Sequence, residues 1–485
     1  MTWQEYKNKL PKHYSENNLA VIERAFNFAS EAHKDENRQT GEPYINHPIA
    51  VSLKIAELKL DPDTIAAALL HDVCETNGIL FKKIRKDFGP QISFLVDGLT
   101  KINKIEYQGI ERNAESIRKM FMAMARDIRV IIIKLLDRLH NLETLYALSE
   151  EKQKRIATET LEIYAPIADR LGMGNIKLKL EDTAFKYAYP AEYEWIIKKT
   201  KEKIPEREEY LAKKVIPTLK KELQKNNINI KKIEHRAKHY YSLWKKLLRY
   251  DMNWYTIYDL AAVRIVVESL EDCYAVLGII HKLWKPLPGR IKDYISLPKQ
   301  NGYQSLHTTV ICTNKKITEF QIRTQKMHEE AEYGIAAHWA WEMAGKPANI
   351  KNMPHKKLAW VKQLYDWHKK SPKNTTSEEF LESLKLDFFE NRVFTLTPKG
   401  DIIDLPEGAT PIDFAYGIHS DIGNSISACK VNNRIVSLSH KLVSGDLVEV
   451  ITQKNKKPNL KMLEYAKTSN AKNCIKSALK KTNRN

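Results

Sequence analysis

The chain has 485 residues, of which 43% are hydrophobic and 29% charged, and its formal net charge is +19. This composition is typical of a globular protein of about three domains, and the positive charge favours polyanionic partners. The longest strongly apolar run, Val130–Leu136, contains Lys134 and is far shorter than the ~20 residues that span a bilayer. The N-terminus lacks the apolar core of a signal peptide, and the five cysteines form no CxxC pair. We therefore predict a soluble, cytoplasmic protein with reduced thiols and no membrane partner.

The first 148 residues or so are predicted to be helical. Apolar residues recur at helical spacing over 20–33, an Asp-Pro pair opens a run of strong helix formers over 61–75, and residues 130–145 are apolar on nearly all sides. Adjacent residues on one helix lie ~100° apart, so His71 and Asp72 can lean toward one edge. Asp137 and Asn141 are four residues apart and share a face.

These helices carry a candidate metal site formed by His47, His71, Asp72 and Asp137. Two imidazoles and two carboxylates suit manganese, iron or zinc, and the donor types alone do not choose between them. Such an ion would polarise a phosphate and activate water. A lone histidine is more often structural, but four such residues in one buried helical block favour metal binding over that alternative.

A second candidate site lies in the middle of the chain. Two β-type runs, 261–268 and 316–324, flank a basic loop rich in glycine and proline. Asp259 precedes the first run and Glu319 lies inside the second. Two carboxylates can hold hard divalent cations while Lys and Arg neutralise phosphate charge, which predicts a phosphoryl-type transfer. The alternative for either acid alone is a strand cap or a solvent-facing side chain. No GxxxxGK[ST] motif occurs, which excludes a P-loop kinase.

Longer motifs show a family resemblance. HRAKHYYSLWKK, RIKDYI, PKQNGYQSLHTTV, EFQIRT and AEYGIAAHW, between His235 and Trp339, resemble the synthetase domain of the long RelA/SpoT homologues. The motifs R..GEPYI.HP, HD..E and K..DRLHN..TL, between Arg38 and Leu145, resemble the HD-type hydrolase domain of the same family. The resemblance implies one domain that transfers pyrophosphate from ATP to the 3′-hydroxyl of GDP or GTP. It implies a second domain that removes the 3′-pyrophosphate of (p)ppGpp with manganese.

The hydrolase resemblance assigns manganese ligands and nucleotide contacts. The ligands are His47, His71, Asp72 and Asp137; Arg38 and Asn141 would contact the nucleotide, and Glu75 belongs to the catalytic acid pair. The family's hydrolases usually read HDxxED, whereas this chain reads HDVCET and has Thr76 where an Asp is expected. A hydroxyl cannot serve as a carboxylate proton shuttle near neutral pH. We therefore expect a retained metal site and a hydrolase that either works through Glu75 alone or is weakened.

The synthetase resemblance assigns three groups of residues. The ATP side comprises Arg236, Lys238, Ser242, Lys246 and Arg264. Within it, Lys246 lies close to the transferred group and Arg264 packs on adenine. Asp259 and Glu319 would hold magnesium, with Glu319 as the base for the 3′-hydroxyl. The acceptor pocket comprises Lys299, Asn301, Tyr303 and His307, and Tyr303 would stack on guanine. The loop 290–293 reads RIKD, the form found in two-activity enzymes, so it favours a bifunctional enzyme whereas Thr76 argues mildly against one.

The remaining segments complete a multidomain α+β prediction. The domains are an all-helical HD hydrolase domain (1–150), a helical connector (151–200), a mixed α/β nucleotidyltransferase-like synthetase domain (201–342), a linker (343–389) with a short helix at 358–370, a small β-grasp TGS domain (390–453) with one helix, and the start of a basic helical region (454–485). By analogy, the connector is a natural place for a switch between the two sites.

The TGS resemblance implies contact with the tRNA acceptor end on the ribosome through His419. A surface or capping histidine is an equal alternative for this residue, and no DNA partner is expected. The zinc-finger-like and ACT modules of full-length relatives are missing from the chain, so ribosome-dependent activation and amino-acid sensing are in doubt. The hypothesis from a different class is a non-enzymatic regulator that binds tRNA or ribosome.

Overall fold

The computed structural model describes residues 1–76, 81–100, 119–337, 383 and 392–482, except 125, 202, 255, 256, 258, 259, 300 and 455. Its contacts divide the chain into two compact units, Met1–Lys101 with Met122–Trp360, and Ile102–Phe121 with Val361–Asn485. Among the described residues, no helix combines the length and apolarity that crossing a bilayer requires. Asp259 and the short helix predicted at 358–370 lie outside the described residues.

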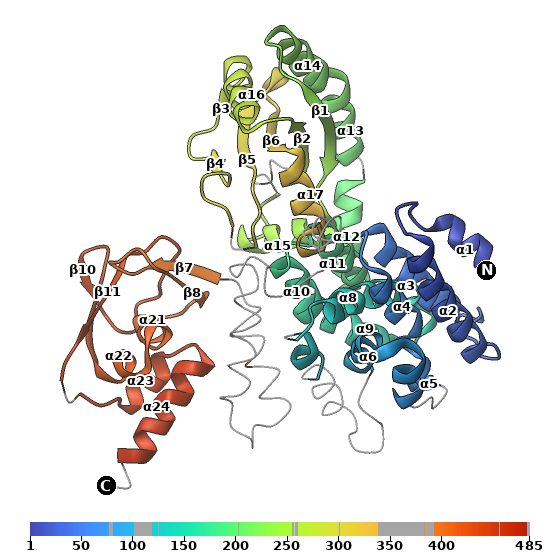
Figure 1. Cartoon of the computed structure of the whole chain (residues 1–485). Coiled ribbons are helices and arrows are strands. Elements are labelled where there is room, and N and C mark those ends of the chain that lie inside the picture. Colours follow the sequence, from blue (N-terminus) through green and yellow to red (C-terminus); the bar gives the residue numbers. More distant parts are fainter. Residues whose placement is uncertain are drawn as a thin grey trace. The chain divides into compact units, whose positions relative to one another are not determined.

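The N-terminal part of the first unit is a helical bundle (Figure 1). Its helices are α1 (Trp3–Lys9), α2 (Glu16–Ala32), α3 (Asn46–Glu57), α4 (Pro62–Leu70), α5 (Val73–Thr76), α6 (Phe81–Leu99) and α8 (Arg129–Glu143), followed by the 3-10 turn η1 (Leu145–Ala147). Helix α8 packs against α3 and α6, and most of its residues are buried, as its apolar sequence predicts. Asp61 caps α4 by accepting a hydrogen bond from the Thr64 amide, with Pro62 in the first turn.

The helix predicted over 61–75 is interrupted, which corrects one expectation. Helix α4 ends at Leu70 and α5 begins at Val73, so His71 and Asp72 form a turn between two helices and do not share a continuous one. The Asp72 carbonyl accepts from the Glu75 amide, which starts the new turn. In this turn His71 Nε2 lies 3.3 Å from Asp72 Oδ2.

The connector is helical, as predicted, and it contacts both halves of the first unit. It consists of α9 (Glu150–Glu159), the π-helical turn η2 (Thr160–Tyr164), α10 (Ala165–Arg170), α11 (Gly174–Ala188) and α12 (Pro190–Thr200). Helix α11 packs against α8 and α9 on the N-terminal side. It also contacts α15 (Tyr240–Arg249) and α17 (Gln325–Tyr333), so one helix supports both sequence-predicted sites.

The rest of the first unit is a six-stranded mixed sheet with helices (Figure 1). Its further elements are α13 (Lys203–Tyr210), η3 (Leu211–Val215), α14 (Ile216–Lys225), β1 (Ile230–Ala237), β2 (Ala261–Val267), α16 (Leu270–Leu283), β3 (Lys285–Pro286), β4 (Lys292–Asp293), β5 (Leu306–Ile311), η5 (Thr313–Lys315) and β6 (Ile317–Thr324). The strand order is β1-β2-β6-β5-β3, and β4 also pairs with β5. Strands β2 and β6 are parallel, and this register pairs Glu319 with Ala262.

The second unit contains a small β-grasp-like module and two following helices. The elements are β7 (Arg392–Leu396), β8 (Ile402–Pro406), α21 (Pro411–Ile418), α22 (Ser420–Ser425), β9 (Ile426–Val431), β10 (Arg434–Val436), β11 (Val448–Thr452), α23 (Leu460–Tyr465) and α24 (Ser469–Thr482). Two helices, not the one predicted, lie between β8 and β9. The buried Asp413 carboxylate accepts from the Lys467 and Thr468 amides, and this ties α21 to the chain that leads into α24.

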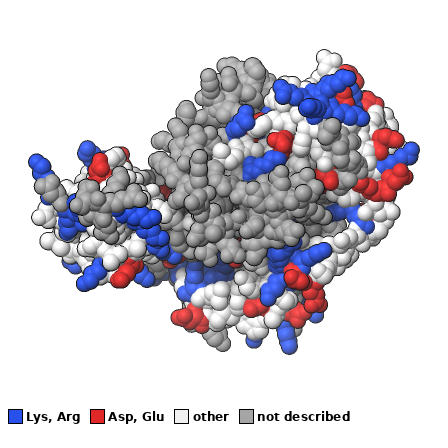
Figure 2. Space-filling model, turned by 90° about the horizontal axis from the view of Figure 1, so that it is seen from below, with Lys and Arg blue, Asp and Glu red and all other residues white. Residues whose placement is uncertain are grey.

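On the face of the molecule shown in Figure 2, Lys and Arg atoms lie over several parts of the described surface, and Asp and Glu atoms lie near many of them.

Candidate active sites

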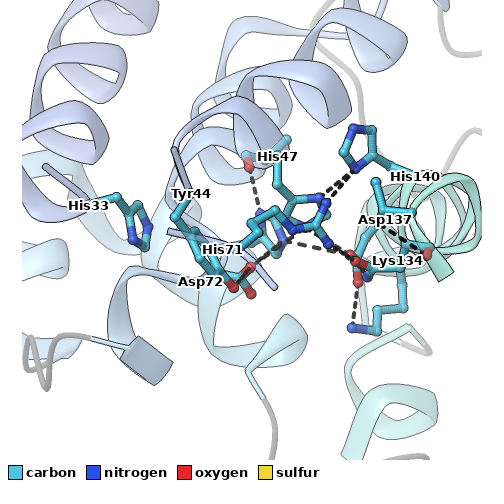
Figure 3. A network of polar contacts seen from close by, with 12 residues as sticks. His33, Tyr44, His47, His71, Asp72, Lys134, Asp137 and His140 are labelled. Carbon is cyan, nitrogen blue, oxygen red and sulfur yellow. Dashed lines mark hydrogen bonds and ion pairs between the residues drawn. The ribbon is translucent and has the colours of Figure 1, made fainter. Parts of the chain in front are cut away.

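The structure brings together all four predicted metal ligands in the helical bundle (Figure 3). The ligand atoms of His47 on α3, His71 after α4 and Asp137 on α8 all lie within 4.8 Å of one another, and all three side chains are buried. The Asp72 carboxylate adjoins them, with its Oδ2 3.3 Å from His71 Nε2 and 3.6 Å from His47 Nε2. Three separate helical segments thus contribute to one small polar centre.

The hydrogen bond of His71 shows why this centre suits a cation. His71 Nδ1 lies 2.7 Å from the Ala68 carbonyl, and a carbonyl only accepts, so Nδ1 carries the proton. In the neutral ring, Nε2 then keeps a lone pair. That nitrogen is buried without a hydrogen-bond partner among the described residues, and it faces two carboxylates. A lone pair and two anions repel one another unless a cation lies among them, so the donor set fits a divalent metal ion.

The electrostatics keep the ligands in the protonation states that a metal ion needs. Burial raises the pKa of Asp137, but the pKa still lies well below its ordinary value, and the Lys134 ammonium contributes most to lowering it. Lys134 Nζ lies 2.7 Å from Asp137 Oδ2, which leaves Oδ1 on the histidine side. Burial lowers the pKa of His47, although Asp137 opposes the shift. The result is an ionised carboxylate beside a neutral imidazole.

Three supporting residues were missed by sequence reasoning. The Tyr44 hydroxyl donates to Asp72 Oδ2 at 2.8 Å, Lys134 neutralises Asp137, and His140 contacts His47. Burial raises the pKa of Tyr44, so the phenol keeps its proton for Asp72. All three residues lie within the motifs GEPYINHP and K..DRLHN, and the i,i+3 spacing of Lys134 and Asp137 was a usable signal.

The two residues predicted to contact nucleotide lie beside the candidate metal site. Arg38 donates to Asn141 Oδ1 at 2.7 Å, and Asn141 donates in turn to Asp137. Glu75 is exposed on α5, where it is open to solvent. The side chain of Thr76 lies outside the described residues. Arg38 and Asn141 therefore form one polar edge that continues directly into the ligand set.

The predicted acceptor residues of the synthetase cluster around strand β5. His307 Nδ1 lies 3.1 Å from Glu319 Oε1, and His307 Nε2 lies 2.8 Å from the Tyr303 hydroxyl. The Tyr303 amide donates to the Asn301 side chain at 3.1 Å. Lys299 Nζ lies 5.1 Å from the centre of the Tyr303 ring. These five residues were predicted from one motif and one strand, and the structure places them together.

A residue of the connector holds this acceptor cluster from outside the sheet. Asn301 Nδ2 donates to the Asp169 carbonyl at 3.1 Å, and Asp169 Oδ1 pairs with Lys177 Nζ at 3.1 Å. Nearby, the Ile335 amide donates to the Leu171 carbonyl at 2.9 Å. The turn between α10 and α11 therefore contacts both the acceptor loop and the end of α17.

The predicted ATP side contains a group of arginines on one carboxylate. Glu332 Oε1 lies 3.1 Å from both Arg264 and Arg323 and 3.7 Å from Arg236. Burial raises the pKa of Glu332, but the three guanidinium groups outweigh it and lower the pKa. Arg323 and Glu332 were missed from the sequence. The other predicted contacts, Lys238, Ser242 and Lys246, are half-buried at the end of β1 or on α15.

Comparisons with known proteins agree with this division of the chain. Residues 25–174 match the HD domain family, residues 235–346 match the family described as a region found in RelA / SpoT proteins, and residues 392–452 match the TGS domain family. A guanosine-3′,5′-bis(diphosphate) 3′-pyrophosphohydrolase of Aquifex aeolicus is 49% identical over 481 residues, which cover 99% of this chain and 67% of the relative. The chain belongs to the RelA/SpoT family. The predicted fold class is thereby confirmed.

Other members of the RelA/SpoT family carry names for the opposite reaction or for both. A GTP pyrophosphokinase of Streptomyces antibioticus is 45% identical over 480 residues, covering 96% of this chain and 56% of the relative. A bifunctional (p)ppGpp synthase/hydrolase RelA of Mycobacterium tuberculosis is 42% identical over 481 residues, covering 97% and 64%. This RelA/SpoT chain thus spans 56–67% of the length of these three relatives. HD-domain hydrolases are metal-dependent, and the buried His47, His71 and Asp137 group is able to hold a metal ion.

Proposed function

We propose that this RelA/SpoT chain is a bifunctional (p)ppGpp enzyme. One site, a GTP diphosphokinase, transfers pyrophosphate from ATP to the 3′-hydroxyl of GDP or GTP. The other site is a 3′-pyrophosphohydrolase of (p)ppGpp. The observation that carries the proposal is the convergence of His47, His71, Asp72 and Asp137 beside Arg38. The names of the relatives, which cover both reactions, support it.

The hydrolase site combines ion binding with recognition of an anionic nucleotide. His47, His71, Asp72 and Asp137 hold Mn²⁺, which when bound polarises the pyrophosphate and makes a water molecule more acidic. The charges of Arg38 and Lys134 balance those of Asp72 and Asp137, so a divalent ion leaves the site with positive charge for its substrate. Arg38 binds and orients the nucleotide, with Asn141 fixing its guanidinium. Glu75 accepts or returns a proton from its exposed position on α5.

The proposed synthetase site includes Asp259, which precedes β2 in the sequence, and Glu319, which lies within β6. Asp259 and Glu319 hold Mg²⁺, which when bound neutralises phosphate charge. Glu319 takes the proton of the 3′-hydroxyl, and His307 fixes the carboxylate through its Nδ1. Tyr303 stacks on guanine beside Lys299 and Asn301. Arg236, Lys238, Ser242, Lys246 and Arg264 bind ATP, with Lys246 next to the group that moves.

A close variant of this function is a synthetase with a weakened hydrolase, and Thr76 favours it. Losing one proton-transfer partner costs on the order of 10²–10⁴ in rate. For the rest of the chain, we propose the same domain limits that the sequence predicts. We also keep the TGS domain as a contact for tRNA or ribosome, where His419, with a side chain 66% exposed, is accessible.

The hydrolase claim is tested by measuring pyrophosphate release from ppGpp with and without Mn²⁺. We expect metal-dependent release by the parent protein and none by His71→Ala. The matched control is His13→Ala, which removes an exposed histidine from the same helical region. If neither the parent protein nor its Thr76→Asp variant releases pyrophosphate, the hydrolase part of the proposal is refuted. Equal activity of the parent protein and His71→Ala would refute the assigned site.

A further inference from the structure

His140 lies on α8 directly against the predicted ligand His47, and no role has been assigned to it. The Nδ1 atoms of the two rings are 2.8 Å apart, and the ring centres are 4.9 Å apart (Figure 3). In a hydrogen bond between two imidazole nitrogens, one must donate and the other must accept. The direction of this bond decides which nitrogen of His47 keeps a lone pair.

Arg38 favours one direction for this bond. Its NH1 lies 3.4 Å from the same Nδ1 of His140. A guanidinium group has only donors, so His140 Nδ1 is the acceptor and carries no proton. His47 must then donate from its own Nδ1. Its Nε2 keeps the lone pair, and this atom lies 3.1 Å from Asp137 Oδ1 and 3.6 Å from Asp72 Oδ2.

We propose that His140 is a positioning residue that fixes His47 in its Nδ1–H tautomer and turns its Nε2 toward the metal ion. The inference rests on the metal site of the proposed function. The Ala68 carbonyl performs the same task for His71, so the two imidazole ligands are oriented by two different acceptors. A ligating histidine commonly donates its other N–H to such an acceptor, which fixes its orientation. His140 is not counted as a ligand, because its Nδ1 is engaged by His47 and the ligand atoms that converge are those of His47, His71 and Asp137.

The bond also links metal binding to the nucleotide edge. Arg38 contacts both His140 and Asn141, and Asn141 contacts Asp137. A closed ring of hydrogen bonds and ion contacts therefore runs from one ligand, His47, through His140, Arg38 and Asn141 to another ligand, Asp137. His140 is the member of this ring that side-chain substitution can alter without touching a ligand or the nucleotide residues.

Substitutions of matched shape separate the role of an acceptor from the role of bulk. His140→Asn places an oxygen near the position of Nδ1, whereas His140→Leu has similar size and no acceptor. His140→Gln keeps a polar side chain but sets its oxygen further out. Each full-length variant is titrated with Mn²⁺ while free Mn²⁺ is followed by electron paramagnetic resonance. The metal-free unfolding midpoint of each variant is measured alongside, and His71→Ala identifies which binding step belongs to this site.

We expect Mn²⁺ affinity at this site to fall about 10- to 100-fold in His140→Leu and His140→Gln. His140→Asn, which keeps an acceptor near the position of Nδ1, should lose clearly less affinity than either of these variants. If His71→Ala removes the site while His140→Leu and His140→Gln bind as tightly as the parent, the role of His140 is refuted and the metal site stands. Equal weakening in His140→Asn and His140→Leu would also refute it. If His71→Ala leaves every binding step unchanged, the metal site itself is wrong. If His140→Leu does not fold, the comparison of Mn²⁺ affinity between His140→Gln and His140→Asn decides the question.

Discussion

The junction between the connector and the synthetase part depends on a glycine at the end of α17. Gly334 has φ 58° and ψ −128°, a conformation that residues with a side chain rarely adopt. A Cβ at this position would lie 2.2 Å from the Leu171 carbonyl oxygen and 2.6 Å from the Met173 nitrogen. Both are backbone atoms of the turn between α10 and α11, so no side-chain rotation relieves the clash. We therefore predict that Gly334→Ala separates these two segments.

The expected cost has two parts. The strained backbone costs about 1–3 kcal/mol. The clash adds a second cost, because reaching ordinary contact, at 3.4 Å or more, requires the turn to move by over 1 Å. That movement breaks the hydrogen bond from the Ile335 amide to the Leu171 carbonyl and leaves a buried donor, which costs about 1–3 kcal/mol.

Gly89→Ala is the matched control for backbone strain alone. Gly89 has φ 85° and ψ 174°, and a Cβ there would meet nothing within 4 Å. Calorimetric unfolding of both full-length variants should give a midpoint for Gly334→Ala at least about 2 °C below that of Gly89→Ala, given the clash term above. If the two variants unfold at the same temperature, the predicted clash between a side chain at position 334 and the turn between α10 and α11 is refuted.

Three further predictions concern the two sites and the pH dependence of stability. Thr76→Asp should raise Mn²⁺-dependent ppGpp hydrolysis by about tenfold or more, since a carboxylate restores a proton shuttle. Thr76→Asn, measured in the same assay, should not raise it. Equal hydrolysis rates in the parent protein and both variants would contradict this prediction. Adding Mn²⁺ should raise the unfolding midpoint of the parent protein, because an ion that binds only the folded state stabilises it. The midpoint of His71→Ala should rise less. An identical rise in both proteins would mean that the ion binds elsewhere. Burial and Arg323 lower the pKa of His328 to about 4, below its value of 6.5 in the unfolded chain, so protonation of the unfolded state removes stability as the pH falls from 6.5 toward 4. Urea unfolding at pH 7 and pH 5 should therefore show a smaller loss for His328→Gln than for the parent, and an equal loss would refute the assignment.

Part of the candidate metal site could be predicted from the sequence, because local spacing and residue type indicate which side chains share a face. Asp137 and Asn141 share a face of α8 by helical periodicity alone, and Asn141 does donate to Asp137. The Asp-Pro start of α4 was likewise predictable from the sequence. The turn at His71 and Asp72 was not, because a run of good helix formers gives no sign of a break.

Contacts between distant segments were beyond the sequence. Asn301 and Asp169 are 132 residues apart, and nothing in either motif indicates that a connector residue holds the acceptor loop. The close approach of the connector to the synthetase part, where a Cβ at Gly174 would lie 2.5 Å from the Ala331 carbonyl oxygen, required the folded structure. The same holds for Glu332, which gathers three arginines from β1, β2 and β6.

The central claim is that one chain holds two independent sites with opposing chemistry. It is tested most directly by measuring both reactions on one preparation: ppGpp synthesis from ATP and GDP with Mg²⁺, and pyrophosphate release from ppGpp with Mn²⁺. We predict that Glu319→Gln abolishes synthesis and leaves hydrolysis intact, and that His71→Ala does the reverse. Loss of both reactions in either folded variant, or full synthesis by Glu319→Gln, would contradict the account.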